Sequence, residues 1–81
     1  MYIQFIENAN QPVGRVCEDE PNIYSLYVGK GSIFSYELAI RNFIMLYANE
    51  GDTVYIDYKT KPDIIKILSQ YKISLVISCT V

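Results

Sequence analysis

Few residue types that could carry out chemistry are available in this chain, because it contains no histidine. A Ser-His-Asp triad, a Cys-His dyad and the usual zinc ligand sets are therefore excluded. Cys17 and Cys79 are too few for a disulfide scaffold and lack the spacing of metal ligands. In the leading interpretation we expect no catalytic residue, no metal and no cofactor.

The remaining polar candidates fall near the expected ends of strands and beginnings of helices. If the first, third, fourth and fifth strands are parallel, their carboxyl ends meet at one edge of the sheet. Open α/β sheets bind ligands at that edge. Glu7, Glu37 and the segments 29–32 and 60–63 would then converge there.

Two serines are candidate anion-binding residues. Ser32 and Ser35 are alternative N-caps of the first helix, whose free backbone amides would suit an anion. The segment 29–32 lacks the length of a phosphate-binding P-loop, so it is also compatible with a plain turn. Glu37 precedes Arg41 by four residues, which equally fits a surface ion pair on a helix.

Hydrophobic periodicity and turn residues divide the chain into the elements that must position these side chains. The segments 53–59 and 73–78 read as strands, and a helix over 64–71, starting within 60–63, joins them. Two strands joined by a crossover helix lie parallel, almost always in a right-handed unit. We therefore expect one α/β domain over residues 1–81, in the order β-β-β-α-β-α-β. The earlier elements are expected as strands at 2–6, 13–17 and 23–28 and a helix from Ser32 or Ser35 to Tyr47.

The helix stripe and the last strand carry further expectations. Tyr36, Ile40, Phe43, Ile44 and Tyr47 recur at helical spacing and predict the buried face, which Leu38 and Met45 widen. The last strand is apolar on both faces, as is typical of a covered parallel strand.

This element order resembles the core of the ribonuclease H-like fold. The resemblance covers most of the chain and implies a five-stranded mixed sheet, in the order 3-2-1-4-5, with only the second strand antiparallel. Enzymes of that family hold two magnesium ions with carboxylates for phosphodiester hydrolysis. The matching positions here are Glu37, in Ser35-Tyr36-Glu37-Leu38-Ala39, Glu7 after the first strand and Asp57 within the fourth. A nuclease interpretation would therefore use Glu7, Glu37 and Asp57 with magnesium.

The implied strand order also makes a prediction about the cysteines. Strands 2 and 5 would be three steps apart, or about 14 Å at about 4.8 Å per step. A disulfide cannot span that distance without distortion. We therefore expect Cys17 and Cys79 to be free thiols or to form an intermolecular bridge.

Length and charge limit the classes of partner. A domain of 81 residues with eight tyrosines is small enough that dimerisation would add useful stability. Tyrosine suits a half-wet interface, although the rings could simply line outer strand faces. The net charge is −2 and no basic stripe is present, so binding to nucleic acid is not expected. No signal peptide and no membrane-spanning apolar run is visible, so we expect a cytoplasmic protein.

These observations favour a small non-enzymatic protein that acts by protein–protein contact, with an unknown protein partner and a possible homodimer. The heavy use of Ile, Tyr, Lys and Asn is similar to that of accessory proteins of viruses with AT-rich genomes, including archaeal viruses, which would imply the host cytoplasm. The alternatives are the magnesium-dependent nuclease and a protein that binds a small anion at Ser32.

Overall fold

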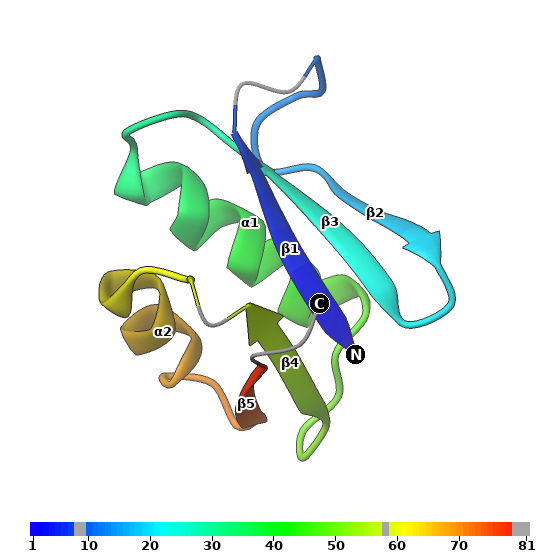
Figure 1. The fold of residues 1–81 in the computed structure, drawn as a ribbon. Helices are drawn as coiled ribbons and strands as arrows, with labels where there is room; N and C mark the ends of the chain where they lie inside the picture. Colours follow the sequence, from blue (N-terminus) through cyan, green and yellow to red (C-terminus); the bar gives the residue numbers. More distant parts are fainter. Residues whose placement is uncertain (8–9, 58, 79–81) are drawn as a thin grey trace.

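The fold is described from a computed structural model, which covers residues 1–7, 10–57 and 59–78 (Figure 1). This described part contains five strands and two helices in the order expected from the sequence. Their bounds are β1 Tyr2–Glu7, β2 Val16–Glu20, β3 Ile23–Val28, α1 Ile33–Leu46, β4 Thr53–Asp57, α2 Pro62–Leu68 and β5 Ser74–Ser78. The predicted α/β class is therefore confirmed.

All strands except β2 run in the same direction. β3 pairs with β1 in parallel from Tyr2–Ile23 to Glu7–Val28, and β5 pairs with β4 in parallel over all five residues. Pro62 stands at the beginning of α2, where its missing N–H would have no helical partner. The parallel unit β4-α2-β5 is therefore confirmed, and β3 and β4 lie on either side of β1.

The strand order is 2-3-1-4-5, so the expected order 3-2-1-4-5 is wrong at β2 and β3. β2 and β3 form an antiparallel hairpin whose tight turn contains Asn22 in the left-handed region, at φ 66°. The Asn22 carbonyl accepts a bond from the Tyr2 N–H, which places β1 beside β3 instead of β2. The antiparallel direction of β2 itself is as predicted.

The connection that leads to β2 explains how it reaches the outer position. The second strand was expected at 13–17 but begins at Val16, because Gly14 bends the chain at φ 89°. The Asn42 amide of α1 donates to the Gly14 carbonyl at 2.8 Å, and a Cβ on Gly14 would lie 2.7 Å from Leu38. Glycine suits this bend, because it tolerates a positive φ and has no Cβ. The bend brings the chain against α1 before β2 begins.

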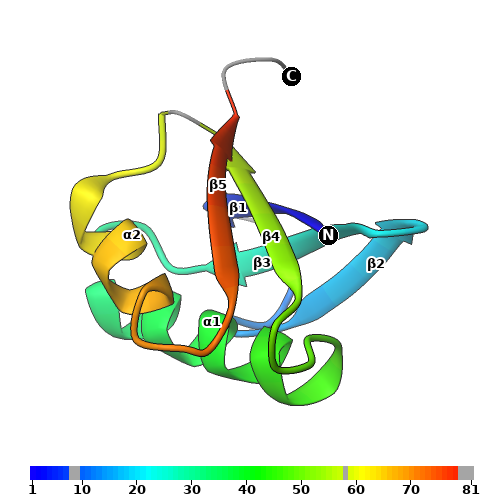
Figure 2. The same ribbon diagram turned by 90° about the horizontal axis from the view of Figure 1, so that it is seen from below.

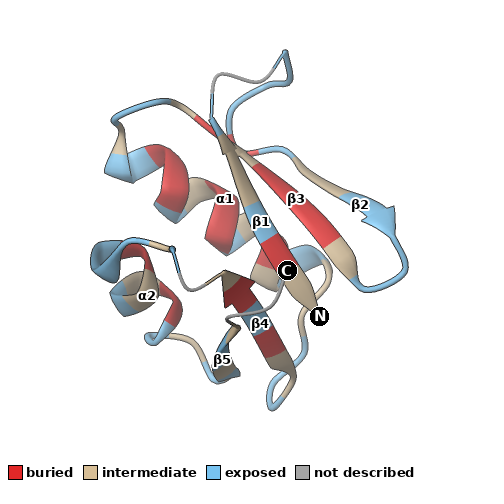
Figure 3. Ribbon diagram, viewed as in Figure 1, coloured by how far each residue is buried: buried red, intermediate tan, exposed pale blue. Residues whose placement is uncertain are grey.

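Both helices pack on the same face of the sheet (Figure 2). The residues between sheet and helices form the buried core, and β3, β4 and α1 carry buried segments of it (Figure 3). The core consists of Ile3, Tyr24, Leu26, Val28, Tyr36, Ala39, Ile40, Phe43, Val54, Ile56, Ile64 and Leu68. Rings of Tyr24 and Phe43 meet edge to face with centroids 5.2 Å apart. The opposite face of the sheet carries no described helix.

Two sequence expectations on burial are wrong. Met45 does not widen the stripe of α1 but is exposed, because two residues of helix turn it about 200° from the buried Phe43. β5 is not covered on both faces: it is a terminal strand, and Val76 and Ile77 are 38% and 49% exposed. The stripe of Tyr36, Ile40 and Phe43 is buried as predicted, with Ile44 and Tyr47 packed against it. Of the described helices, neither has the length and apolar character that crossing a membrane requires.

Candidate functional site

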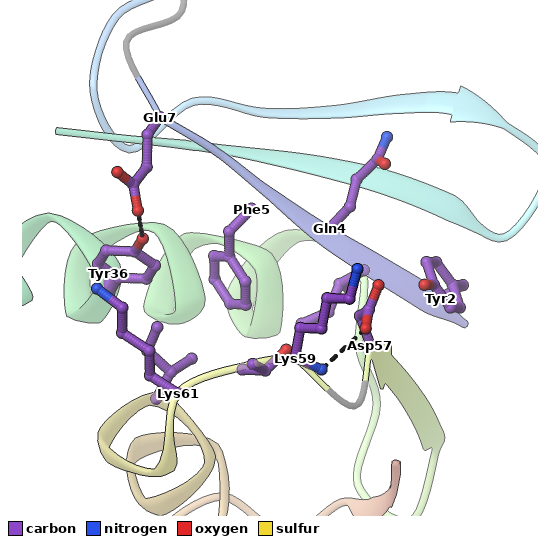
Figure 4. A pocket seen from close by; sticks show the side chains of 11 residues that line it. Tyr2, Gln4, Phe5, Glu7, Tyr36, Asp57, Lys59 and Lys61 are labelled. Carbon is purple, nitrogen blue, oxygen red and sulfur yellow. Dashed lines mark hydrogen bonds between the residues drawn. The ribbon is translucent and has the colours of Figure 1, made fainter. Parts of the chain in front are cut away.

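A cleft opens at the carboxyl ends of β1 and β4, where these neighbouring strands separate (Figure 4). β1 pairs with β3 along its whole length, whereas its described pairing with β4 is confined to Tyr2–Tyr55. The cleft has a volume of about 340 Å³, near the lower end of the range for ligand pockets. Its walls include Phe5 and Glu7 of β1, Tyr36 of α1, Asp57 at the end of β4, and Lys59 and Lys61 after it.

Glu7 and Tyr36 are joined across this cleft by a short hydrogen bond. The Tyr36 hydroxyl donates to Glu7 Oε1, and the Tyr36 ring also contacts Phe5, with centroids 5.2 Å apart. Burial raises the pKa of the Tyr36 phenol to about 12, and the bond to Glu7 and its negative charge act in the same direction. Tyr36 is therefore a neutral donor near pH 7 that fixes the Glu7 carboxylate.

Asp57 belongs to a tight turn at the end of β4. Its Oδ1 accepts a bond from the Lys59 N–H at 2.8 Å, and its carbonyl accepts one from the Thr60 N–H at 3.0 Å. Such a turn directs the carboxylate toward its own backbone. Lys59 and Lys61 add two positive charges to a wall that already carries Glu7 and Asp57, so the formal charges of these four side chains balance.

Glu37 lies outside the cleft. It is exposed on α1 and lines a separate groove with Arg41 of α1 and Ile67 of α2. Within residues 1–7, 10–57 and 59–78, no group of three Asp, Glu, Cys or His side chains is placed to hold a metal ion. The structure thus brings together Glu7 and Asp57 but not Glu37. No salt bridge joins Glu37 to Arg41 in the described chain either.

The two candidate anion-binding serines organise the loop that precedes α1. Ser32 is the N-cap, and its Oγ accepts a bond from the Ser35 N–H at 3.4 Å. Ser35 is buried; its Oγ accepts a bond from the Gly29 N–H at 2.9 Å and lies 2.7 Å from the Ser32 carbonyl. The Ser35 hydroxyl is therefore engaged by the backbone of its own loop, while half-buried Ser32 borders a small pocket with Lys61 and Asp63.

The face of the sheet opposite the helices carries a line of four apolar side chains across four strands. The register pairs Ile23 with Tyr2, Tyr2 with Tyr55, and Tyr55 with Val76. Register partners project to the same side, so Ile23, Tyr2, Tyr55 and Val76 form one continuous row, called here the apolar row. Tyr55 and Val76 are 42% and 38% exposed, and the other two are half-buried.

A polar row lies beside the apolar row on the same face. Cys17 pairs with Ser25 and Ser25 with Gln4 in the sheet register. The Gln4 amide donates to the fully buried Ser25 Oγ at 2.9 Å, and the Ser25 hydroxyl donates to the Asp19 carboxylate in a short bond. These bonds satisfy the buried hydroxyl, although neither of the described helices covers it.

The two terminal strands of the sheet differ in charge. β2 carries Glu18, Asp19 and Glu20, whereas β5 has the sequence Ser-Leu-Val-Ile-Ser and no charge. Cys17 is a free thiol, as expected, and four strand steps now separate β2 from β5 instead of three. Cys79 lies outside the described residues.

The sequence did not identify Tyr36 as a partner of Glu7, since its spacing matched an ordinary core position. It also could not align the apolar row, because that alignment depends on strand register. Comparison with known proteins adds no further guide: no family model, no curated protein and no solved structure matches the chain.

Proposed function

We propose that this chain is a non-enzymatic binding protein that acts by contact with another protein through the apolar row. The observation that carries the proposal is the continuous alignment of Ile23, Tyr2, Tyr55 and Val76 on the face without a described helix. An antiparallel or mixed sheet can leave one face to water, but that face is then usually polar. Exposed aromatic and aliphatic side chains in a row, with a polar row beside them, have the composition of a protein interface.

Other exposed apolar residues are less suited to this role. Phe34 and Met45 stand near opposite ends of α1, eleven residues or about 17 Å apart along the helix axis, so they do not form one patch. The cleft between β1 and β4 is balanced in charge, and Glu7 and Asp57 already have hydrogen-bond donors. The apolar row is therefore the best supported contact surface.

The test is quantitative capture from a lysate of the native host with matched variants. Tyr55→Lys places a charge in the middle of the apolar row, whereas Met45→Lys places the same charge on an exposed apolar site of α1. We expect the wild type and Met45→Lys to enrich the same protein, and Tyr55→Lys to lose about 90% or more of it, since central aromatic residues carry much of the binding free energy. Equal enrichment by all three proteins would refute the role of the apolar row.

The magnesium-dependent nuclease is the second candidate, and the shared placement of Glu7 and Asp57 in the cleft favours it. The described donor set does not fit a two-magnesium centre of the kind the resemblance implies, because Glu37 is elsewhere and no third carboxylate replaces it. Incubation of the protein with a labelled RNA–DNA hybrid and magnesium or manganese provides the test. Cleavage that is lost in both Glu7→Gln and Asp57→Asn would support a nuclease; no cleavage would remove it.

A further inference from the structure

β5 offers a backbone edge in the plane of the sheet. The Ser74 N–H donates to the Asp52 carbonyl at 2.9 Å, so the backbone groups of Ser74 point toward β4. The direction of these groups alternates along a strand, and those of Leu75 and Ile77 therefore point outward, away from the sheet. β5 is the last strand in the sheet order, so no described strand pairs with these outward groups.

The sequence of β5 suits pairing with a copy of itself. Ser-Leu-Val-Ile-Ser reads nearly the same in both directions around Val76 and contains no charge. The β2 strand at the other edge carries three consecutive acids, which would oppose like charges in an antiparallel pairing of two copies centred on Glu18 or Asp19. Of the two edges in the described sheet, the uncharged β5 edge is therefore the better suited to self-pairing.

We infer that two copies of this chain form a dimer by antiparallel pairing of their β5 strands, with the two-fold axis passing beside Val76. In this register Leu75 of one copy lies opposite Ile77 of the other, and the two residues exchange both N–H···O bonds. The two Val76 side chains then form the closely spaced pair without mutual hydrogen bonds. The contact is isologous, because each strand contributes the same residues to it.

The dimer joins the two apolar rows into one. Val76 ends the row at the β5 edge, so its contact with Val76 of the second copy continues the row across the two-fold axis. The acidic β2 strands remain at the two far ends of the joined sheet, about 19 Å from β5 at four steps of about 4.8 Å. The inference deepens the proposed function, since it doubles the same surface, but dimerisation is measured without any other protein.

Sedimentation equilibrium from micromolar to millimolar concentration measures the dimer directly. A single short strand buries less area than a standard interface of roughly 1,200–2,000 Å², so we expect dissociation within this concentration range. Val76→Lys opposes two like charges at the two-fold axis and should raise the dissociation constant about tenfold or more. Val13→Lys, the same change at an exposed site beyond the two-fold contact, should leave the constant unchanged. A wild type that is monomeric throughout overturns the inference.

Oxidative cross-linking tests the register and does not depend on the folding of the lysine variant. Val76→Cys is combined with Cys17→Ser and Cys79→Ser, so that one thiol remains, and Val13→Cys in the same background is the control. We expect a disulfide-linked dimer from Val76→Cys and none from Val13→Cys. A sedimenting dimer that does not cross-link through position 76, or that cross-links equally through position 13, overturns the β5 pairing.

The two proposals can fail separately. A monomer whose capture of a host protein still depends on Tyr55 would refute the dimer and retain the proposed function. A β5 dimer whose capture is unaffected by Tyr55→Lys would retain the dimer and refute the proposed function.

Discussion

The two faces of the sheet differ in how far their apolar side chains are buried. On the helix face, Leu26, Val54 and Ile56 are fully buried beneath α1 and α2. On the opposite face, Tyr55 and Val76 are exposed. Tyr55 belongs to β4, as Val54 and Ile56 do, and Val76 belongs to the neighbouring strand β5. Burial stabilises the fold, whereas an exposed apolar row adds little to it. The difference indicates that burial on the helix face stabilises the fold, whereas the apolar side chains of the other face are available for contact.

The face of the sheet opposite the helices contains a hydrogen-bonded polar row as well as the apolar row. Ser25 on that face is fully buried, yet its hydroxyl is satisfied by Gln4 and Asp19. A sheet whose outer face served only as a solvated surface would place polar side chains along all its rows. Here one row is polar and hydrogen-bonded, and the adjacent apolar row extends across four strands. A half-buried register pair, Ile6 and Tyr27, lies on the other side of the polar row.

Leu26→Ala should have the largest effect on stability. It removes a fully buried side chain from the helix face, and such truncations cost about 2–5 kcal/mol of unfolding free energy. Val76→Ala on the uncovered face should cost less than about 1 kcal/mol, because the side chain is partly exposed. Urea denaturation monitored by circular dichroism measures both. Equal losses at the two positions would contradict the contrast between the faces.

Alkaline pH should weaken the helix face through Tyr36. Its pKa is raised from 10.0 to about 12 in the folded chain, chiefly because burial disfavours the phenolate. The contribution of Tyr36 is therefore fully present below pH 10 and is lost as pH rises through about 12, by roughly 2–3 kcal/mol. Burial also raises the pKa of Tyr24, which acts in the same direction.

Stability measured between pH 9 and pH 12 tests this prediction, with Tyr36→Phe as the matched variant. The wild type should lose stability more steeply than Tyr36→Phe above pH 10, while Tyr24 leaves a residual slope in both. Identical slopes would show that the Tyr36 hydroxyl ionises as freely as in the unfolded chain.

Ser25→Ala should have an intermediate effect. The change removes the hydroxyl that links Gln4 to Asp19, and losing such a bond costs about 1–2 kcal/mol. Gln4 and Asp19 are themselves exposed and can turn to water, which limits the loss. Thermal unfolding measures it, with Gln4→Ala as a control expected to cost less. If Ser25→Ala is as stable as the wild type, the polar row does not stabilise the sheet.

Tyr55→Lys should have the smallest effect on stability and yet a large effect on binding. Exposed surface substitutions usually change the unfolding free energy by less than about 0.5 kcal/mol, and Tyr55 is an exposed residue on the uncovered face. Its unfolding curve in urea should overlay that of the wild type. A loss of several kcal/mol would show that the apolar row is structural, and would remove the separation of roles between the faces.

Local patterns in the sequence predicted most of the elements and the parallel crossover unit β4-α2-β5. The spacing of Ile40 and Phe43, the cap at Ser32 and the proline at the beginning of α2 depend only on nearby residues, and all are observed. The parallel pairing of β4 and β5 followed from the helix between them. These inferences needed no knowledge of distant contacts.

The order of β2 and β3 depended on contacts that sequence reasoning did not see. The resemblance implied that β2 pairs with β1, but the bend at Gly14 against Leu38 and the turn at Asn22 place β3 between them. Glu37 illustrates the same limit at the candidate site: the sequence placed it in the first turn of the helix, but it is the fifth residue of α1, beyond the first turn. The side of α1 that it occupies depends on how the helix packs. The apolar row likewise could not be predicted, because its alignment depends on the register of the strands.

Hydroxyl-radical footprinting of the free protein and of its complex with the captured partner tests the central claim most directly. The account predicts that labelling of Tyr2 and Tyr55 falls in the complex, while labelling of Phe34 and Met45 on α1 is unchanged. Protection confined to α1, with Tyr2 and Tyr55 labelled as in the free protein, would contradict the assignment of the uncovered sheet face as the contact surface.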